Sequence, residues 1–408
     1  KVYQNIKFKF EDFQSKEILI SNKYDFKNLN EFYYDWEILK NGNKVLEGSI
    51  KEFYLKPQDS KLIKLDLPEI SNESEYFLNI YAKKKDKSDL IPKNHIVAYE
   101  QFFLGGKRIF QNKRGESEIV KISQNKNTLN LKGENFNIIF DKNNGLLTEI
   151  DYGNGNIIIE GIKPNFWRSP TDNDYGYFMP SKLKVWKKAS KNQILESFKF
   201  KNYKKEGVQV KSKYILPSIK GSVEISYIIN TNGKIDVKTS LTNISSKLPI
   251  LPKFGTNFII NKKYNKAKWY GRGPHENYQD RKTSSLFGIY ESYVSDLYYP
   301  YIRPQENGNR TDIRWLTLTD PYGKGIIIET QEVFEFSAHH QKNEDFDGGN
   351  RKSQTHTTDI IKRPIVNLNI DYKQMGVGGD NSWGMLPHKK YQINPKDLIF
   401  RYSISPYK

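Results

Sequence analysis

The chain has 408 residues, more than one ordinary domain contains, and aromatic residues make up 14% of it, enough to supply a sizeable core. It has no cysteine, which excludes disulfides and thiolate chemistry. The formal charge is +18, but lysines are interleaved with Asp, Glu and Asn along the whole length. We therefore expect a solvated basic surface and no nucleic-acid partner.

The first residues, KVYQNIKFKF, are strand-like and do not resemble a signal peptide. We expect a piece cut from a longer polypeptide, whose compartment the sequence does not indicate. No apolar run is long enough to span a membrane, so no membrane partner is expected.

The next segments alternate apolar and polar residues, as β-strands do. In EFYYDWEILK (31–40) the apolar residues fall on one face, and Asn41 and Gly42 then supply a hairpin turn before NKVLEGSI leads back. SEYFLNIYA (74–82) alternates in the same way, at the spacing of a β-sandwich. From about residue 106 the sequence turns polar, and we place a domain boundary near residue 118, giving a first domain of 1–118.

Longer strands follow in a second domain, 119–408. GVQVKSKYIL, SVEISYIIN and KIDVKTSLTN are separated by Pro, Gly or Asn, and predict a large antiparallel β structure. The one persuasive helix is SKLKVWKKASKN (181–192), with Leu183 and Trp186 on one side. Nothing repeats as strand–helix units, so the fold class is all-β and no (β/α) barrel is encoded.

A polar cluster in NFWRSPTDNDYG (165–176) first suggests a calcium loop. An EF-hand would need glycine where Tyr177 stands and a carboxylate where Leu183 stands, so we expect a turn held by side-chain-to-backbone bonds instead. The histidine pair His339 and His340 has no zinc-site spacing, and no metal ligand is predicted.

Two further stretches are rich in polar residues. YGRGPHENYQDR (270–281) lacks the third glycine of a nucleotide-binding fingerprint. PQENGNRTDIRW (304–315) includes Glu306 and Arg310, and so dense a polar span is costly if it is buried without partners. It forms either an internal network or the lining of a pocket for a hydroxyl-rich ligand. The residue types favour neither.

MGVGGDNSWG (375–384) has three glycines before its single tryptophan, Trp383, which predicts an irregular loop. Two readings of Trp383 are open. It plugs the core beneath the loop, or it presents an aromatic platform to a ligand.

These motifs, with FSAHH (336–340), occur in the same order in the C-terminal region of the glycoside hydrolase family 2 β-galactosidases, which this chain resembles. The resemblance covers the second domain, the small-chain domain, and more loosely the first. It implies an immunoglobulin-like sandwich followed by a large galactose-mutarotase-like sandwich. It also implies an enzyme that hydrolyses terminal β-D-galactosides with retention, through two glutamates on a central barrel, with magnesium and sodium nearby.

Neither glutamate has a counterpart in this chain, so we expect no catalytic residue, no metal site and no cofactor here. By the resemblance, Trp383 stacks on the sugar beyond the scissile bond and Gly176 begins a mobile loop. Glu306 and Arg310 remain candidate sugar contacts. The expected partners are galactosides and the enzyme's own barrel, with a homo-oligomer left open. The alternatives are a free-standing carbohydrate-binding module, an aldose 1-epimerase that pairs His339 or His340 with Glu306, and a structural unit that assembles subunits.

Overall fold

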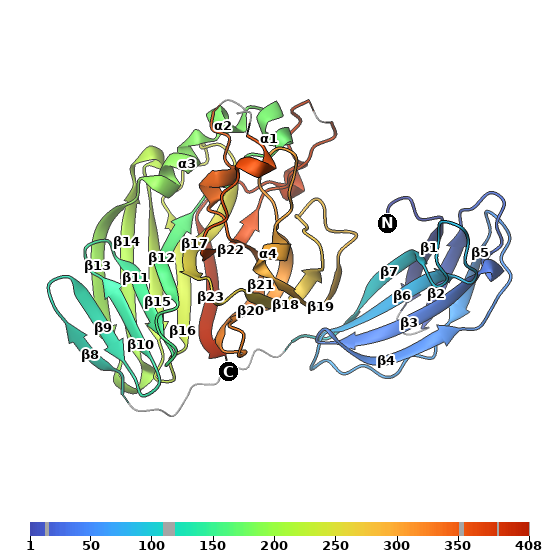
Figure 1. Ribbon diagram of the computed structural model, residues 1–408, viewed down its shortest axis with the longest axis horizontal. Helices are drawn as coiled ribbons and strands as arrows, with labels where there is room; N and C mark the ends of the chain where they lie inside the picture. Colours follow the sequence, from blue (N-terminus) through green and yellow to red (C-terminus); the bar gives the residue numbers. More distant parts are fainter. Residues whose placement is uncertain (13–15, 109–118, 351–354, 382, 408) are drawn as a thin grey trace. The chain divides into compact units, whose positions relative to one another are not determined.

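The computed structural model describes residues 1–408 except 13–15, 109–118, 351–354, 382 and 408 (Figure 1). The chain divides into two compact units, one comprising Lys1–Gln111 with Thr283–Ile289, the other Asn112–Lys282 with Tyr290–Lys408. The boundary predicted near residue 118 lies outside the described residues and stays a prediction.

The first unit is a sandwich of two antiparallel sheets. One has the order β1-β2-β5 and the other β4-β3-β6-β7. Their strands are β1 (Ile6–Asp12), β2 (Glu17–Asn22), β3 (Phe32–Lys40), β4 (Asn43–Ile50), β5 (Ser60–Lys64), β6 (Tyr76–Lys84) and β7 (Ile96–Gly105). Ile18 and Ile20 of one sheet and Trp36 and Ile80 of the other belong to one buried core. Seven strands in two sheets match the expected immunoglobulin-like architecture.

The predicted hairpin is confirmed. β3 ends at Lys40, β4 begins at Asn43, and the two residues between them have left-handed backbones, with φ of 48° at Asn41 and 85° at Gly42. Asn and Gly tolerate this conformation, which a two-residue turn between twisted strands requires.

The second unit contains a four-stranded sheet and a twelve-stranded sheet, all antiparallel. The small sheet has the order β11-β10-β9-β8, and the large one has the order β12-β17-β22-β21-β23-β16-β15-β14-β13. Three further strands branch from the large sheet: β20 pairs with β21, β18 pairs with β20, and β19 pairs with β18. The strands of the small sheet are β8 (Lys121–Gln124), β9 (Thr128–Lys132), β10 (Asn137–Asp141) and β11 (Leu146–Asp151). Those of the large sheet are β12 (Ile158–Asn165), β13 (Ile194–Asn202), β14 (Val208–Leu216), β15 (Gly221–Ile229), β16 (Ile235–Thr242), β17 (Lys253–Asn261), β18 (Lys266–Gly273), β19 (Leu286–Tyr293, of which the second unit holds the part from Tyr290), β20 (Arg310–Thr319), β21 (Gly325–His339), β22 (Ile365–Gln374) and β23 (Leu398–Tyr407).

The two sheets of this unit pack through the side chains that the alternation predicts to be buried. Val223, Ile225, Tyr227 and Ile229 on β15 are all buried, and the ring of Tyr227 lies 5.1 Å from that of Phe140 on β10. Burying such rings adds to the apolar stabilisation that the buried Ile, Leu and Val side chains provide. The all-β fold class is confirmed.

Four short α-helices interrupt the strands in the part of the chain that the structure describes, and three of them lie together at one end of the second unit (Figure 1). They are α1 (Asp172–Gly176), α2 (Met179–Lys182), α3 (Lys184–Lys191) and α4 (Val294–Leu297). The helix predicted over 181–192 is corrected to α3, because the chain leaves helical geometry at Leu183, where φ is −104° and ψ is 9°. No helix in the described ranges is long and apolar enough to cross a membrane.

Trp186 anchors α3 to the core. Its side chain is fully buried, its indole N–H donates to the Pro249 carbonyl at 3.0 Å, and its ring lies 6.2 Å from that of Phe166. Leu183 is buried as well, so the side of the helix that the sequence marks as apolar is the side that packs.

The large sheet also buries ionisable groups. Glu335 on β21 lies directly opposite Asp371 on β22, and Asp371 pairs with the equally buried Lys253 at 2.9 Å. Glu335 accepts hydrogen bonds from Gln279 at 2.6 Å and Asn309 at 2.9 Å. Burial, assisted by the neighbouring Asp371, nevertheless raises the pKa of Glu335 to about 7.

Replacing Trp186 by Ala is expected to lower the free energy of unfolding by about 3–5 kcal/mol, because it empties a fully buried site and removes an indole hydrogen bond. Lys188→Ala on the exposed side of the same helix is the control, expected to change stability by about 0.5 kcal/mol or less. Urea unfolding of both variants checks this. Equal losses would contradict the packing role of Trp186.

Glu335 is expected to make stability depend on pH. The unfolded chain releases this proton near pH 4.5 and the folded chain near 7, so its contribution is present at low pH and is lost as pH rises between these values. Relative to Glu335→Gln, the native chain should lose about 1–3 kcal/mol of unfolding free energy between about pH 5 and about pH 8. Urea unfolding at both pH values measures the difference. A constant difference would show that Glu335 titrates normally.

Candidate functional site

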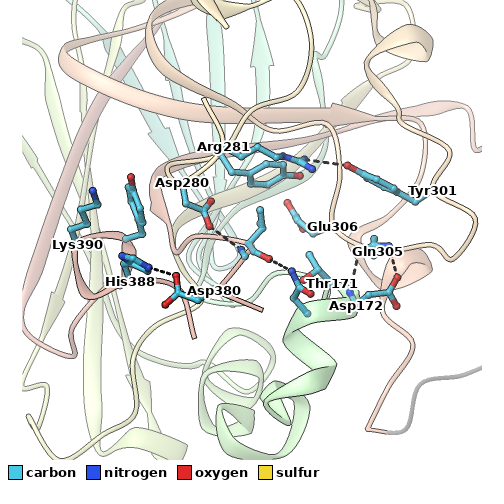
Figure 2. A pocket seen from close by; sticks show the side chains of 16 residues that line it. Thr171, Asp172, Asp280, Arg281, Tyr301, Gln305, Glu306, Asp380, His388 and Lys390 are labelled. Atoms are coloured by element: carbon cyan, nitrogen blue, oxygen red, sulfur yellow. Dashed lines mark hydrogen bonds and ion pairs between the residues drawn. The ribbon is translucent and has the colours of Figure 1, made fainter. Parts of the chain in front are cut away.

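Four of the motifs found in the sequence meet around one pocket of the second unit, with a volume of about 490 Å³ (Figure 2). They contribute the start of α1, the loop after β18, the loop before β20 and the segment between β22 and β23. The lining residues are Thr171, Asp172, Asn173, Tyr278, Asp280, Arg281, Tyr301, Gln305, Glu306, Val377, Gly378, Gly379, Asp380, His388, Lys390 and Tyr391.

A buried ion pair joins the first of these segments to the last. The carboxylate of Asp174 accepts from Arg168 at 2.9 and 3.0 Å, and the same guanidinium donates to the carbonyls of Met375 at 2.6 Å and Gly376 at 2.9 Å. Asp174 also closes the first turn of α1 with Thr171 in a reciprocal capping box. The turn expected over 165–176 is therefore present, as a capped helix.

The glycines of MGVGGDNSWG allow the chain to approach Asp280 closely. The N–H of Gly378 donates to the Asp280 carboxylate at 2.8 Å. A Cβ atom at Gly376 would lie 2.5 Å from that carboxylate, closer than a side chain tolerates. Asn173 holds the same segment from the other side by donating to the Val377 carbonyl at 3.2 Å. These contacts fix the loop against the pocket wall.

The PQENGNR segment forms both of the arrangements that the sequence left open, because some of its residues line the pocket and others belong to an internal network. Gln305 and Glu306 line the pocket; Gln305 bonds the backbone and side chain of Asp172, and Glu306 accepts from Gln374 at 3.2 Å. Arg310 is buried instead and does not line it. Its guanidinium donates to the carbonyls of Leu297, Gly308 and Pro274 at 3.2, 2.6 and 3.2 Å.

Desolvation lowers the pKa of Arg310 to about 10, and its bonds to backbone carbonyls place it within the internal network. Arg310 thus holds backbone in place, and its donors to those carbonyls are not available to a sugar. Glu306 remains the candidate of the pair that faces the pocket.

The two histidines of FSAHH do not line the pocket that contains Glu306. His339 is buried and bonds Asn307 at 3.0 Å, and burial lowers its pKa to about 3, so the ring is neutral. His340 bonds the Ile365 carbonyl at 2.6 Å. In the described part of the chain, no three His, Asp or Glu side chains are grouped to hold a metal ion.

Trp383 lies on the surface, with 87% of its area exposed. The core-plug reading is therefore wrong, and the platform reading stays a prediction. Gly384, with φ of 112°, packs against Gly176 so tightly that a Cβ atom there would lie 2.4 Å from the Gly176 carbonyl oxygen. The two loops that the resemblance singled out are therefore neighbours. Phe178, in the loop after Gly176, is also exposed.

Sequence reasoning missed Arg168, Tyr278 and Asp280. Arg168 and Asp280 had a weak signal, being charged residues beside aromatic ones in WRSP and ENYQDR. Their partners lie 207 and 98 residues away, and only the fold shows that pairing.

The sequence of the chain matches known families and known proteins over most of its length. A family model described as "Beta galactosidase small chain" matches residues 132–404, and one described as "Beta-galactosidase, domain 4" matches residues 18–105. Proteins named beta-galactosidase from Priestia megaterium (strain DSM 319 / IMG 1521) and Lactobacillus delbrueckii subsp. bulgaricus are 31% and 29% identical, over 96% of this chain and 38% of their own length in both cases. The chain thus spans about 38% of the length of these relatives.

Among solved structures, galactose 1-epimerase from Lactobacillus acidophilus NCFM is similar with a TM-score of 0.38 and 8% sequence identity, covering 72% of this chain and 98% of that one. The family matches confirm the resemblance first seen in the motifs. Because the small-chain model covers more than half of its residues, this chain belongs to the β-galactosidase small chain family.

Proposed function

We propose that this chain is the part of a family 2 β-galactosidase that supports the active site and contributes sugar contacts, while a separate barrel domain carries the catalytic glutamates. The exposed Trp383 is the observation that carries the proposal, because a large aromatic side chain held on an anchored loop is costly to leave in water unless something covers it. The substrate class is terminal β-D-galactosides, cleaved with retention.

The proposed contact is stacking of the Trp383 indole on the apolar C–H face of a sugar ring. Removing both surfaces from water favours this contact, and the flat indole restricts the orientation of the ring. Gly176 and Gly384 hold the tryptophan loop against the end of α1, so motion of one loop is coupled to the other. The segment after Gly176 contains α2, in which Pro180 is buried near the start, and this stiffens a loop that the resemblance describes as mobile.

No catalytic step is assigned to residues of this chain. Retaining hydrolysis needs a carboxylic acid and a carboxylate about 5–5.5 Å apart across the scissile bond. Two of the four pocket carboxylates, Asp172 and Asp380, are engaged by Arg303 and His388. The magnesium and sodium ions implied for the whole enzyme by the resemblance belong, in this proposal, to the barrel.

The chain alone is expected not to hydrolyse a chromogenic β-galactoside, because it supplies no nucleophile. The measurement is release of nitrophenol by the purified chain, with the longer enzyme that contains it as the positive control. Turnover that persists through purification and is abolished by a substitution in this chain would overturn the proposal.

In that longer enzyme, Trp383→Ala is expected to weaken the sugar bound beyond the scissile bond by about 1–3 kcal/mol, the value for uncovering a large apolar side chain. Stability should be almost unchanged because the side chain is 87% exposed. The affinity for the sugar is measured from the kinetics of transfer to acceptor sugars. Stability is measured by thermal unfolding.

Tyr322→Ala is a matched control, since Tyr322 is 88% exposed in the turn between β20 and β21, outside both loops. It should change neither affinity nor melting. A lowered melting temperature with unchanged sugar affinity for Trp383→Ala would assign Trp383 a structural role.

A further inference from the structure

In the described part of the chain, three neighbouring strands, β17, β22 and β21, bury two carboxyl groups beside one ammonium group. Glu335 on β21 and Asp371 on β22 are 2% and 0% exposed, and Lys253 on β17 is 1% exposed. The ammonium of Lys253 lies 2.9 Å from the Asp371 carboxylate, so these two charges neutralise each other. Because a buried charge is costly unless it is paired, the carboxyl group left to be explained is that of Glu335.

The other charged groups of this region do not supply a second cation. They are matched in two sets, Arg272 and Lys282 with Asp312, and Arg168 with Asp174. Asp312 itself adds to the negative charge that acts on Glu335. Glu306, which lines the pocket, interacts electrostatically with both Lys253 and Arg168 and so brings one more carboxylate to the region. Glu335 therefore has no cation of its own among the described residues.

This imbalance opposes the ionisation of Glu335. Burial removes its carboxylate from water, and Asp371, directly opposite on β22, adds a like charge; together they raise the pKa of Glu335 to about 7. Burial raises the pKa of Asp371 in the same way, so the two carboxyl groups titrate as a coupled pair. The pair therefore changes its charge at neutral pH, where an ordinary carboxyl group stays ionised.

A chain of side-chain amides leads from Glu335 to the pocket. Asn309 donates to Glu335 at 2.9 Å, and the amide oxygen of the same Asn309 accepts from Gln374 at 3.0 Å. Gln374 also donates to Glu306 at 3.2 Å. Glu306 is the end of the chain that lines the pocket (Figure 2). Asn309 and Gln374 are 0% and 1% exposed, so solvent water does not compete for these bonds.

The strength of the first bond in this chain depends on the charge of Glu335. In the ionised form both carboxylate oxygens only accept, and each receives one amide N–H, from Gln279 at 2.6 Å and from Asn309 at 2.9 Å. Protonation replaces one acceptor position by an O–H donor and removes the charge, and hydrogen bonds to an ionised group are about twice as strong as neutral ones. Glu335 therefore holds Asn309 firmly when it is ionised and weakly when it is protonated.

We propose that Glu335 is a proton switch that sets the freedom of Glu306 in the pocket. Above neutral pH the ionised carboxylate orders Asn309 and Gln374, and Gln374 then fixes the side chain of Glu306. Below neutral pH the protonated group loosens this chain, and Glu306 is free to turn within the pocket. The inference goes beyond the sugar contact proposed for Trp383, and it requires neither a barrel nor a bound sugar.

The test is a titration of the purified chain between about pH 5.5 and about pH 8.5, followed by NMR of its side chains. The amide NH2 signals of Asn309 and Gln374 should shift with a common midpoint near pH 7, and the carboxyl carbon of Glu306 should show an inflection at the same pH. Glu335→Gln cannot titrate, so all three responses should be lost. Glu332→Gln is the matched control, because Glu332 is exposed on the same strand; it should leave the midpoint unchanged.

Two further variants test the charge balance and the chain separately. Asp371→Asn should lower the midpoint by at least about one pH unit, because it removes a like charge and leaves Lys253 available to Glu335. Gln374→Met should keep the response of Asn309 and abolish that of Glu306, because it removes the amide that joins them.

Three outcomes would overturn the proposal. An Asn309 signal that stays constant over this pH range would show that Glu335 keeps one charge state. A response of Asn309 that persists in Glu335→Gln would assign the proton to another group. A Glu306 signal without the inflection, while Asn309 titrates, would show that the chain does not reach the pocket. The first and third outcomes are read from the native chain, so neither depends on the folding of a core variant.

Discussion

The buried ion pair between Arg168 and Asp174 is the interaction on which the site depends. Both side chains are removed from water, so the pair is acceptable only because each partner is bonded to further groups. Arg168 reaches the carbonyls of Met375 and Gly376, and Asp174 caps α1 and accepts from Tyr177 at 3.0 Å. Removing one partner from such a pair typically costs about 3–5 kcal/mol, because the other charge is left buried alone.

The pair also joins two parts of the second unit, the helix that lines the pocket and the glycine-rich loop that carries Trp383. On one side it fixes the start of α1, which lines the acidic pocket and ends at Gly176. On the other it fixes the first residues of the glycine-rich loop that ends in Trp383. A buried guanidinium with several backbone acceptors has few alternative arrangements, so both parts are held in a defined position before any ligand arrives.

Local features of the sequence were sufficient for much of the fold. The Asn41–Gly42 turn and the alternation through Val223 and Ile229 follow from the geometry of single strands, and the structure confirms them. The exposure of Trp383 was one of two readings, favoured by a family resemblance and not by the residues alone. Helix limits were less predictable, since the break at Leu183 lies between two short helices, α2 and α3, that contact each other.

The pocket itself was not predictable from the sequence. Asp280 and Gly378 are 98 residues apart and Arg168 and Met375 are 207 apart, and no periodicity encodes such pairs. The missed α1 had a local signal, because Thr171 and Asp174 have the spacing of a capping box, with aspartate in place of the usual glutamate or glutamine. That signal gives the start of a helix, but the side on which it meets other segments comes only from tertiary packing.

The acidic pocket and the tryptophan loop differ in burial and in the kind of contact that each can make. Trp383 is apolar, exposed and without a strict hydrogen-bonding requirement, so it tolerates rings of differing substitution. Asp280 and Tyr278 are polar and shielded, and each has an atom without a hydrogen-bond partner among the described residues. Burial therefore distinguishes the two, because the side chain of Trp383 is open to solvent whereas these polar atoms are not.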